Sequence, residues 1–183
     1  MRGALETIVG AMFAGKTSEL LKRILWAKHQ NKNIIVIKPN IDNRYSQGKI
    51  ITHNDLSHEC FAMESWQHIH ENFIFDRKSV DVIFLDEIQF MDTVETIENI
   101  ENILHKGIDV VCAGLDQDSR GKPWETSSMV LGLSDKIIKI YGFCNVCGVE
   151  ATKTFRKTEG GGRTQVGAAN IYEPRCLKHW EPR

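Results

Sequence analysis

The first residues that could do chemistry form a glycine-bounded loop ten residues into the chain. The segment fits the pattern G-x-x-x-x-G-K-[ST], in which backbone N–H groups surround the phosphates of a nucleotide. The lysine of this pattern reaches the β- and γ-phosphates, and the hydroxyl that follows it binds Mg²⁺. We therefore predict a phosphate-binding loop, with Thr17 also on the magnesium, that comprises Gly10, Ala11, Met12, Phe13, Ala14, Gly15, Lys16 and Thr17.

Two adjacent carboxylates, Asp86 and Glu87, follow the apolar run of residues 82–85. Phosphate-loop enzymes bring a carboxylate to Mg²⁺ with an Asp at the end of a buried strand. We expect this strand to be the neighbour of the strand that precedes the phosphate loop. Successive side chains of a strand point apart, so Asp86 and Glu87 should serve different partners. We predict that Asp86 faces the metal and that Glu87 acts as general base for the hydroxyl that accepts the phosphoryl group. The alternative is an acidic turn that caps the next helix.

A third candidate site lies near the C-terminus, where two pairs of potential metal ligands each have two residues between their members. Four nitrogen and sulfur ligands with no open position predict a structural, tetrahedral Zn²⁺. The alternatives are unrelated thiols or a redox pair. The segment between the pairs is rich in glycine, and we expect a flexible flap that the metal holds at both ends. The predicted zinc ligands are Cys144, Cys147, Cys176 and His179.

The elements that must position these residues alternate between strands and helices. Unbroken apolar runs are typical of parallel strands that are covered on both faces. Apolar residues at helical spacing follow the phosphate loop and recur between residues 94 and 104. This alternation predicts an α/β fold with a parallel sheet. We expect strands at residues 5–9, 34–37, 82–85, 109–113 and 136–141, in a nucleotide-binding domain of residues 1–142 that precedes a zinc-binding domain of residues 143–183.

Two polar loops leave the carboxyl ends of predicted strands, at residues 42–46 and 114–124. Ligands of parallel α/β sheets bind at this edge of the sheet. Both loops are therefore candidates for substrate binding, although a solvated surface loop remains an alternative for residues 42–46.

The length, net charge and apolar runs of the chain restrict the class of partner. The chain has 183 residues and a formal net charge of −1, so it lacks the basic excess of proteins that wrap nucleic acid or lie on anionic membranes. Its N-terminus has no signal-peptide pattern, and none of its apolar runs approaches the roughly 20 residues of a membrane span. We therefore expect a cytoplasmic protein without a nucleic-acid or membrane partner.

Taken together and in this order, these features resemble the thymidine kinases of the type II family. The resemblance covers the phosphate loop, the 42–46 segment with His53 after it, the motif Asp86-Glu87-x-Gln89-Phe90, and Gly114-Leu115-Asp116. It also covers the split zinc site, with Tyr172 four residues before Cys176. It implies a P-loop fold of the RecA-like type, with helices beside a parallel sheet and a lasso loop between the two halves of the zinc site.

The resemblance also implies a reaction, in which the γ-phosphate of ATP passes to the 5′-hydroxyl of thymidine or deoxyuridine. It gives Glu87 the role of general base, Lys16 and Thr17 those of phosphate and Mg²⁺ binding, and Asp86 that of the metal-associated carboxylate. Arg44 and Arg156 match positions near the transferred phosphate. Family members are commonly homotetramers that dTTP inhibits. The positions that match the nucleoside pocket are Met12, Leu115, Ser119, Trp124, Thr154 and Tyr172.

Two positions depart from the family pattern. Ser119 stands where an aromatic residue usually packs on the base, and Ile88 stands where a smaller residue is common. The first departure keeps a kinase of another deoxynucleoside as an alternative. A P-loop ATPase that binds nucleic acid through its zinc knuckle is a further alternative, against which the absence of a basic stripe argues.

Overall fold

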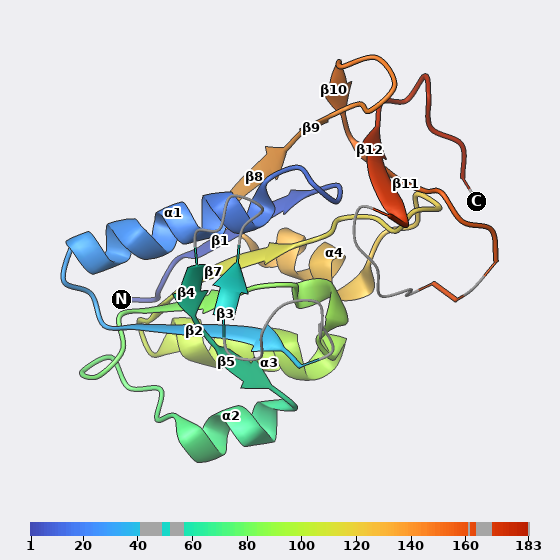
Figure 1. Ribbon diagram of the computed structural model, residues 1–183. Coiled ribbons are helices and arrows are strands. Elements are labelled where there is room, and N and C mark those ends of the chain that lie inside the picture. The colour runs from blue at the N-terminus through green and yellow to red at the C-terminus, as the bar shows by residue number, and fades with distance from the viewer. Residues whose placement is uncertain (41–48, 52–56, 161, 164–169, 183) are drawn as a thin grey trace.

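The computed structural model describes residues 1–40, 49–51, 57–160, 162–163 and 170–182 (Figure 1). Its centre is a six-stranded sheet with the order β5-β2-β6-β7-β1-β8, and every neighbouring pair in it is parallel. The α/β class and the parallel sheet predicted from the sequence are therefore confirmed. The strands are β1 (Leu5–Gly10), β2 (Ile34–Pro39), β5 (Phe61–Met63), β6 (Val82–Leu85), β7 (Asp109–Gly114) and β8 (Lys136–Ile140).

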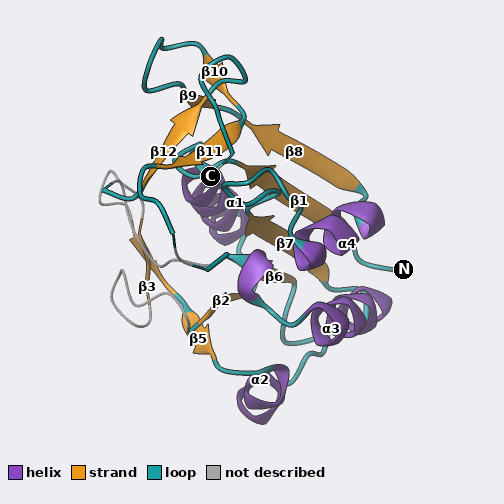
Figure 2. Ribbon diagram, turned by 90° about the vertical axis from the view of Figure 1, so that its right-hand side faces the viewer, coloured by secondary structure: helices purple, strands orange, loops and turns teal. Residues whose placement is uncertain are grey.

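Helices cover both faces of the sheet (Figures 1 and 2). The helix α1 (Lys16–His29) packs on one face, while α2 (Trp66–Asn72), α3 (Thr93–His105) and α4 (Glu125–Leu133) pack on the other. Each of these helices is too short or too polar to cross a bilayer, as far as the described residues go.

The central strands show why their sequences are continuously apolar. In β6, Ile83 and Leu85 pack in the core cluster with α2, α3 and α4, whereas Val82 and Phe84 pack in the cluster with α1. Successive side chains of a strand point to opposite faces, so a strand between two helical layers needs apolar residues at every position.

The strand order corrects one expectation. We expected Asp86 to come from the strand next to the P-loop strand, but β7 lies between β1 and β6. The run of apolar residues cannot reveal this order, because any strand buried on both faces gives the same pattern.

Three small antiparallel pairs lie outside the main sheet. They join β3 (Lys49–Ile51) to β4 (Ser57–Glu59), β9 (Gly142–Phe143) to β10 (Glu150–Ala151), and β11 (Lys153–Arg156) to β12 (Tyr172–Arg175). The last two pairs belong to the C-terminal segment that follows β8 (Figure 1). The predicted domain boundary between residues 142 and 143 falls within β9 and stays a prediction.

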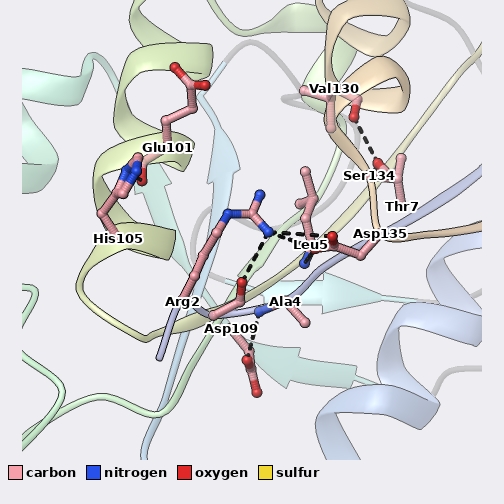
Figure 3. A network of polar contacts seen from close by, with 11 residues as sticks. Arg2, Ala4, Leu5, Thr7, Glu101, His105, Asp109, Val130, Ser134 and Asp135 are labelled. Atoms are coloured by element: carbon pink, nitrogen blue, oxygen red, sulfur yellow. Dashed lines mark hydrogen bonds and ion pairs between the residues drawn. The ribbon is translucent and has the colours of Figure 1, made fainter.

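Polar side chains fix the amino end of β1, the end of the strand opposite to the phosphate loop (Figure 3). Asp135 accepts a hydrogen bond of 2.8 Å from the backbone N–H of Leu5 and forms an ion pair of 3.0 Å with Arg2. Asp109 accepts one of 3.0 Å from the backbone N–H of Ala4. These contacts hold β1 between the amino ends of β7 and β8, so the strand that leads into the phosphate loop is anchored at its start.

At its other end, β1 requires a residue without a side chain. In the register of β1 with β8, Gly10 lies opposite Ile140, and a Cβ built on Gly10 would lie 2.4 Å from the carbonyl oxygen of Ile140. We expect Gly10→Ala to push this backbone apart and to lower the free energy of unfolding by about 1–3 kcal/mol, measured by urea denaturation. The matched control is Gly132→Ala in α4, where no heavy atom lies within 4 Å of the new Cβ. It should raise stability by about 0.5–1 kcal/mol. Equal urea midpoints for Gly10→Ala and the wild type would contradict the close approach.

Candidate active site and metal centre

The predicted phosphate loop connects β1 to α1 and curls over the amino end of the helix. Gly15, the N-cap of α1, has a φ of 92° in the left-handed region, and Phe13 has a φ of 63°. The Nζ of Lys16 donates a hydrogen bond of 2.8 Å to the carbonyl oxygen of Ala11, which holds the ammonium over the loop. The amino end of a helix carries unpaired N–H groups and a partial positive charge. Together with the ammonium of Lys16, these groups can bind a phosphate.

Asp86 is buried directly beyond the end of β6. Its backbone N–H donates to the carbonyl oxygen of Ile37 at 2.9 Å, so β6 still pairs with β2 at this point. Burial and the negative charge of Glu87 raise the pKa of the Asp86 carboxyl to about 7. The N–H of Glu87 and the charges of Lys16 and Lys38 act in the opposite direction. A buried carboxylate whose ionisation is this costly is well suited to a cation.

Lys38 is a part of this site that sequence reasoning missed. It is buried in β2, beside the strand that carries Asp86, and its positive charge acts on that carboxyl together with the charge of Lys16. The only signal in the sequence was the position of Lys38 directly after the apolar run of residues 34–37, where a buried lysine would need a negative partner.

The raised pKa of Asp86 gives a prediction for the metal-free protein. Its carboxyl has a pKa of 3.8 when unperturbed and about 7 in the fold. Because the folded state holds the proton more tightly, this group's contribution to stability is complete below pH 3.8 and is lost as the pH rises through 7. The loss is at most about 1.4 kcal/mol per pH unit. Asp86→Asn cannot ionise. The melting temperature of this variant minus that of the wild type should therefore increase from about pH 4.5 to about pH 7 and then level off.

The control for this pH series is Asp135→Asn. Hydrogen bonds from the N–H of Leu5 and from Arg2 lower the pKa of Asp135, so both folded and unfolded forms are ionised above about pH 5. Its melting temperature relative to the wild type should be constant across the same range. A constant difference for Asp86→Asn as well would contradict the raised pKa.

Glu87 has left-handed backbone angles, with φ 54° and ψ 40°, at the start of the 3₁₀ helix η1 (Ile88–Phe90). Its Oε2 accepts a hydrogen bond from Nε2 of Gln89. The Oε1 of the same Gln89 accepts a hydrogen bond of 2.9 Å from the backbone N–H of Leu115. A non-glycine residue in this conformation costs about 1–3 kcal/mol and persists only where its surroundings hold it. The buried amide of Gln89 therefore fixes the Glu87 carboxylate and ties it to the loop after β7.

That loop approaches Gln89 closely because Gly114 has no side chain. A Cβ at Gly114 would lie 2.8 Å from Oε1 of Gln89 and 2.7 Å from Cγ1 of Ile88. In the sequence, Gln89 and Gly114 could be recognised only as members of two separate motifs. The fold shows that they contact each other.

The predicted nucleoside-pocket residues come from three separate parts of the chain. Thr154 accepts a hydrogen bond of 3.0 Å from the backbone N–H of Met12, which joins β11 to the phosphate loop. Trp124 packs edge-on against Phe90, with ring centroids 5.8 Å apart. Leu115, Ser119 and Tyr172 are buried. The structure thus connects the segment with the four predicted metal ligands to the phosphate loop, and the 114–124 loop to the residues that follow Glu87.

The two arginines predicted near the transferred phosphate have different outcomes. Arg156 is buried in β11, lies opposite Tyr172 in the register with β12, and donates through Nη1 to the carbonyl oxygen of Gly162 at 3.0 Å. Arg44, the rest of the 42–46 segment and His53 lie outside the described residues.

The four predicted metal ligands converge in the fold, with all their ligand atoms within 4.8 Å of one another. The Sγ atoms of Cys147 and Cys176 are 3.8 Å apart, and Nδ1 of His179 lies 3.4 Å from Sγ of Cys176 and 3.7 Å from Sγ of Cys144. A tetrahedral ion with Zn–S of about 2.3 Å and Zn–N of about 2.0 Å needs edges of about 3.8 Å and 3.5 Å. The donor set and the spacing both fit zinc.

The electrostatics around Cys144 also favour a metal. Burial raises the pKa of its thiol, but hydrogen bonds from the backbone N–H groups of Cys176, Val146 and Cys147 and from the ring of His179 outweigh burial. The pKa falls to about 5, so the ligand is already a thiolate at neutral pH.

Comparison with known proteins gives one consistent result. Residues 3–180 match the protein family described as Thymidine kinase. The chain is 33% identical over 180 residues to a thymidine kinase of Rhodothermus sp. (strain ITI 518), and the alignment covers 98% of this chain and 82% of that protein. It is 37% identical over 174 residues to a thymidine kinase of Mesomycoplasma hyopneumoniae (strain 7448), with coverages of 95% and 93%. Among solved structures, domain III of the Thermotoga maritima replication initiation protein DnaA aligns over 76% of this chain and 55% of that one, with a TM-score of 0.46 and 15% identity. This likeness is too weak to indicate function.

Proposed function

The chain belongs to the thymidine kinase family, and on this premise we propose that it transfers the γ-phosphoryl group of ATP to the 5′-hydroxyl of thymidine or deoxyuridine. The products are the nucleoside 5′-monophosphate and ADP. The observation that carries the proposal is the family match over residues 3–180, which includes every segment of the candidate site.

The phosphate end of the reaction is assigned to the loop of residues 10–17. The N–H groups at the amino end of α1 and the ammonium of Lys16 bind the β- and γ-phosphates of ATP. Thr17 and the buried carboxylate of Asp86 would hold Mg²⁺, which supplies charge neutralisation at the phosphates when bound. Arg156, and Arg44 by resemblance alone, add positive charge near the transferred group.

The acceptor end is assigned to Glu87. In this proposal the carboxylate orients the 5′-hydroxyl in line with the γ-phosphoryl group and takes up its proton as the new P–O bond forms. Gln89 supports the role, because its hydrogen bond holds Oε2 of Glu87 and leaves the other carboxylate oxygen for the substrate. The nucleoside itself binds among Met12, Leu115, Ser119, Trp124, Thr154 and Tyr172.

We propose a structural Zn²⁺ at the centre formed by Cys144, Cys147, Cys176 and His179. All ligand positions belong to the protein, so no position is open for a substrate. The ion's role is to hold β11 and β12, the strands that carry Thr154, Arg156 and Tyr172.

A panel of phosphoryl-transfer assays tests the function. The protein with ATP and Mg²⁺ should phosphorylate thymidine and deoxyuridine in preference to deoxycytidine and the purine deoxynucleosides. A preference for one of the latter would favour a kinase of another deoxynucleoside, which the serine at position 119 keeps open. Salt-sensitive retention of DNA or RNA on filters, with ATP hydrolysis but no nucleoside phosphorylation, would favour the nucleic-acid-binding ATPase.

Assembly and regulation follow the family as further proposals. We propose a homotetramer, which the exposed apolar side chains on the edge strand β8 and on α1 support: Ile137 is 53% exposed, Leu25 57% and Trp26 51%. Light scattering tests the mass of the homotetramer in solution.

We also propose inhibition by dTTP, because one molecule with a thymine base and a triphosphate can occupy the nucleoside pocket and the phosphate loop together. The unpaired thiols of Cys60 and Cys112 suit the reducing cytoplasm, where we place the protein.

A further inference from the structure

Arg163 joins the segment between β11 and β12 to the 114–124 loop by three separate contacts. Its Nε forms an ion pair of 2.9 Å with Oδ2 of Asp118, and its Nη2 donates to the carbonyl oxygen of Pro123 at 2.6 Å. Its guanidinium carbon lies 4.2 Å from the centroid of the Trp124 ring. One planar side chain therefore contacts the loop at its middle, near its end and at its aromatic residue.

Asp118 is the residue around which the loop is built. Its side chain is 3% exposed. Its Oδ1 accepts hydrogen bonds from the backbone N–H groups of Arg120, at 3.0 Å, and of Lys122, at 2.9 Å. The two oxygens thus have separate tasks, since Oδ1 shapes the loop and Oδ2 receives Arg163. A buried carboxylate needs a charged or hydrogen-bonding partner, and Arg163 supplies it from a distant part of the chain.

Trp124 is the only aromatic residue in the 114–124 loop, because position 119 is a serine. Stacking of a base on this loop therefore depends on how the Trp124 ring is held. Phe90 contacts the ring edge-on, and Arg163 lies over it. A cation over an indole face is among the stronger interactions of this kind, and the planar guanidinium restricts the orientation of the ring.

We propose that Arg163 is a positioning residue for the nucleoside, which acts by fixing Trp124 and the Asp118-centred loop in the arrangement that receives the base. The inference rests on the proposed function in one respect, the assignment of Trp124 to the nucleoside pocket. Arg163 itself is not a catalytic residue, and ATP binding at the phosphate loop does not depend on it.

The experiment compares Arg163→Gln, Asp118→Asn and the double variant with the wild type. Asp118→Asn keeps Oδ1 for the loop's own hydrogen bonds but replaces Oδ2, which accepts from Arg163, with an amide NH2 that cannot accept. We expect each single variant to raise the KM for thymidine by about fivefold to twentyfold, with kcat and the KM for ATP within about twofold of the wild type. The double variant should be no worse than Arg163→Gln, because both changes break the same contact. Arg163→Lys keeps the charge without the planar fork and should fall between the wild type and Arg163→Gln.

Arg77→Gln is the matched control, because it removes an arginine from the ion pair with Asp81 on the surface, outside the site. Its kinetic constants should equal those of the wild type. A thymidine KM within twofold of the wild type for both Arg163→Gln and Asp118→Asn overturns the proposal. Parallel losses in kcat, the KM for ATP and the melting temperature also overturn it, since they indicate a general structural role.

Tryptophan emission separates this proposal from the proposed function. The emission of Trp124, obtained as the difference between each protein and its Trp124→Phe counterpart, should change in Arg163→Gln without any substrate present. If the wild type phosphorylates no nucleoside while this emission change occurs, the proposed function has failed and the contact itself stands. If the wild type is an active thymidine kinase and Arg163→Gln alters neither the emission nor the thymidine KM, the positioning role has failed alone.

Discussion

Glu87→Gln is expected to lower kcat by about 10²- to 10⁴-fold while the KM for ATP stays within about threefold of the wild type. The amide cannot take the proton of the 5′-hydroxyl, but its oxygen can still accept the hydrogen bond from Nε2 of Gln89. The substitution therefore removes the basic group without removing the contact that shapes η1. Initial rates with thymidine and ATP give the kinetic constants, and titration with a non-hydrolysable ATP analogue gives nucleotide affinity.

Glu98→Gln is the control for that change, because it converts an exposed glutamate of α3 to glutamine away from the candidate site. It should leave both constants unchanged. Near wild-type turnover in Glu87→Gln would remove Glu87 from the role of general base, whereas a large rise in the KM for ATP would assign it to nucleotide binding instead.

Loss of the metal centre should have the second large effect. Cys176→Ser removes a predicted ligand directly after β12. Among its described residues, the C-terminal segment has one small buried apolar cluster of its own, formed by Cys144, Ala151 and Cys176. Structural zinc contributes about 10–16 kcal/mol to the folding of comparable small elements, far more than such a cluster can supply. We expect kcat/KM for thymidine to fall by more than about 100-fold because the strands that carry Thr154, Arg156 and Tyr172 lose their anchor.

Metal analysis and a neighbouring variant complete this experiment. The wild type should contain one zinc per chain, and Cys176→Ser should contain little. Leu177→Ser changes a residue that is 70% exposed between two of the ligands and should keep both the metal and the activity. Full activity in zinc-free Cys176→Ser would show that the C-terminal segment folds and works without the ion.

Much of the architecture could be predicted because the relevant signals are local. The apolar runs at residues 34–37, 82–85 and 109–113 each became a strand of the parallel sheet. The apolar residues at helical spacing between residues 94 and 104 became α3, which ends at His105 just before Gly107, a glycine with a left-handed φ of 81°. The paired spacing of the four metal ligands correctly predicted that they would converge. In each case the pattern arises from backbone conformation or side-chain period within a short segment, so the order of residues is enough.

The sequence by itself thus determined the fold class, the phosphate-loop pattern, the carboxylate pair and the four predicted metal ligands. Only the tertiary structure decided that β7 separates the P-loop strand from Asp86, that Lys38 acts on the same carboxyl, and that Gln89 links Glu87 to Leu115. It also decided the contact between Arg163 and Asp118, which are 45 residues apart. The physical reason is that these contacts depend on which strands become neighbours and which loops meet. That outcome is set by packing the whole core at once, and strands buried on both faces all look alike in sequence.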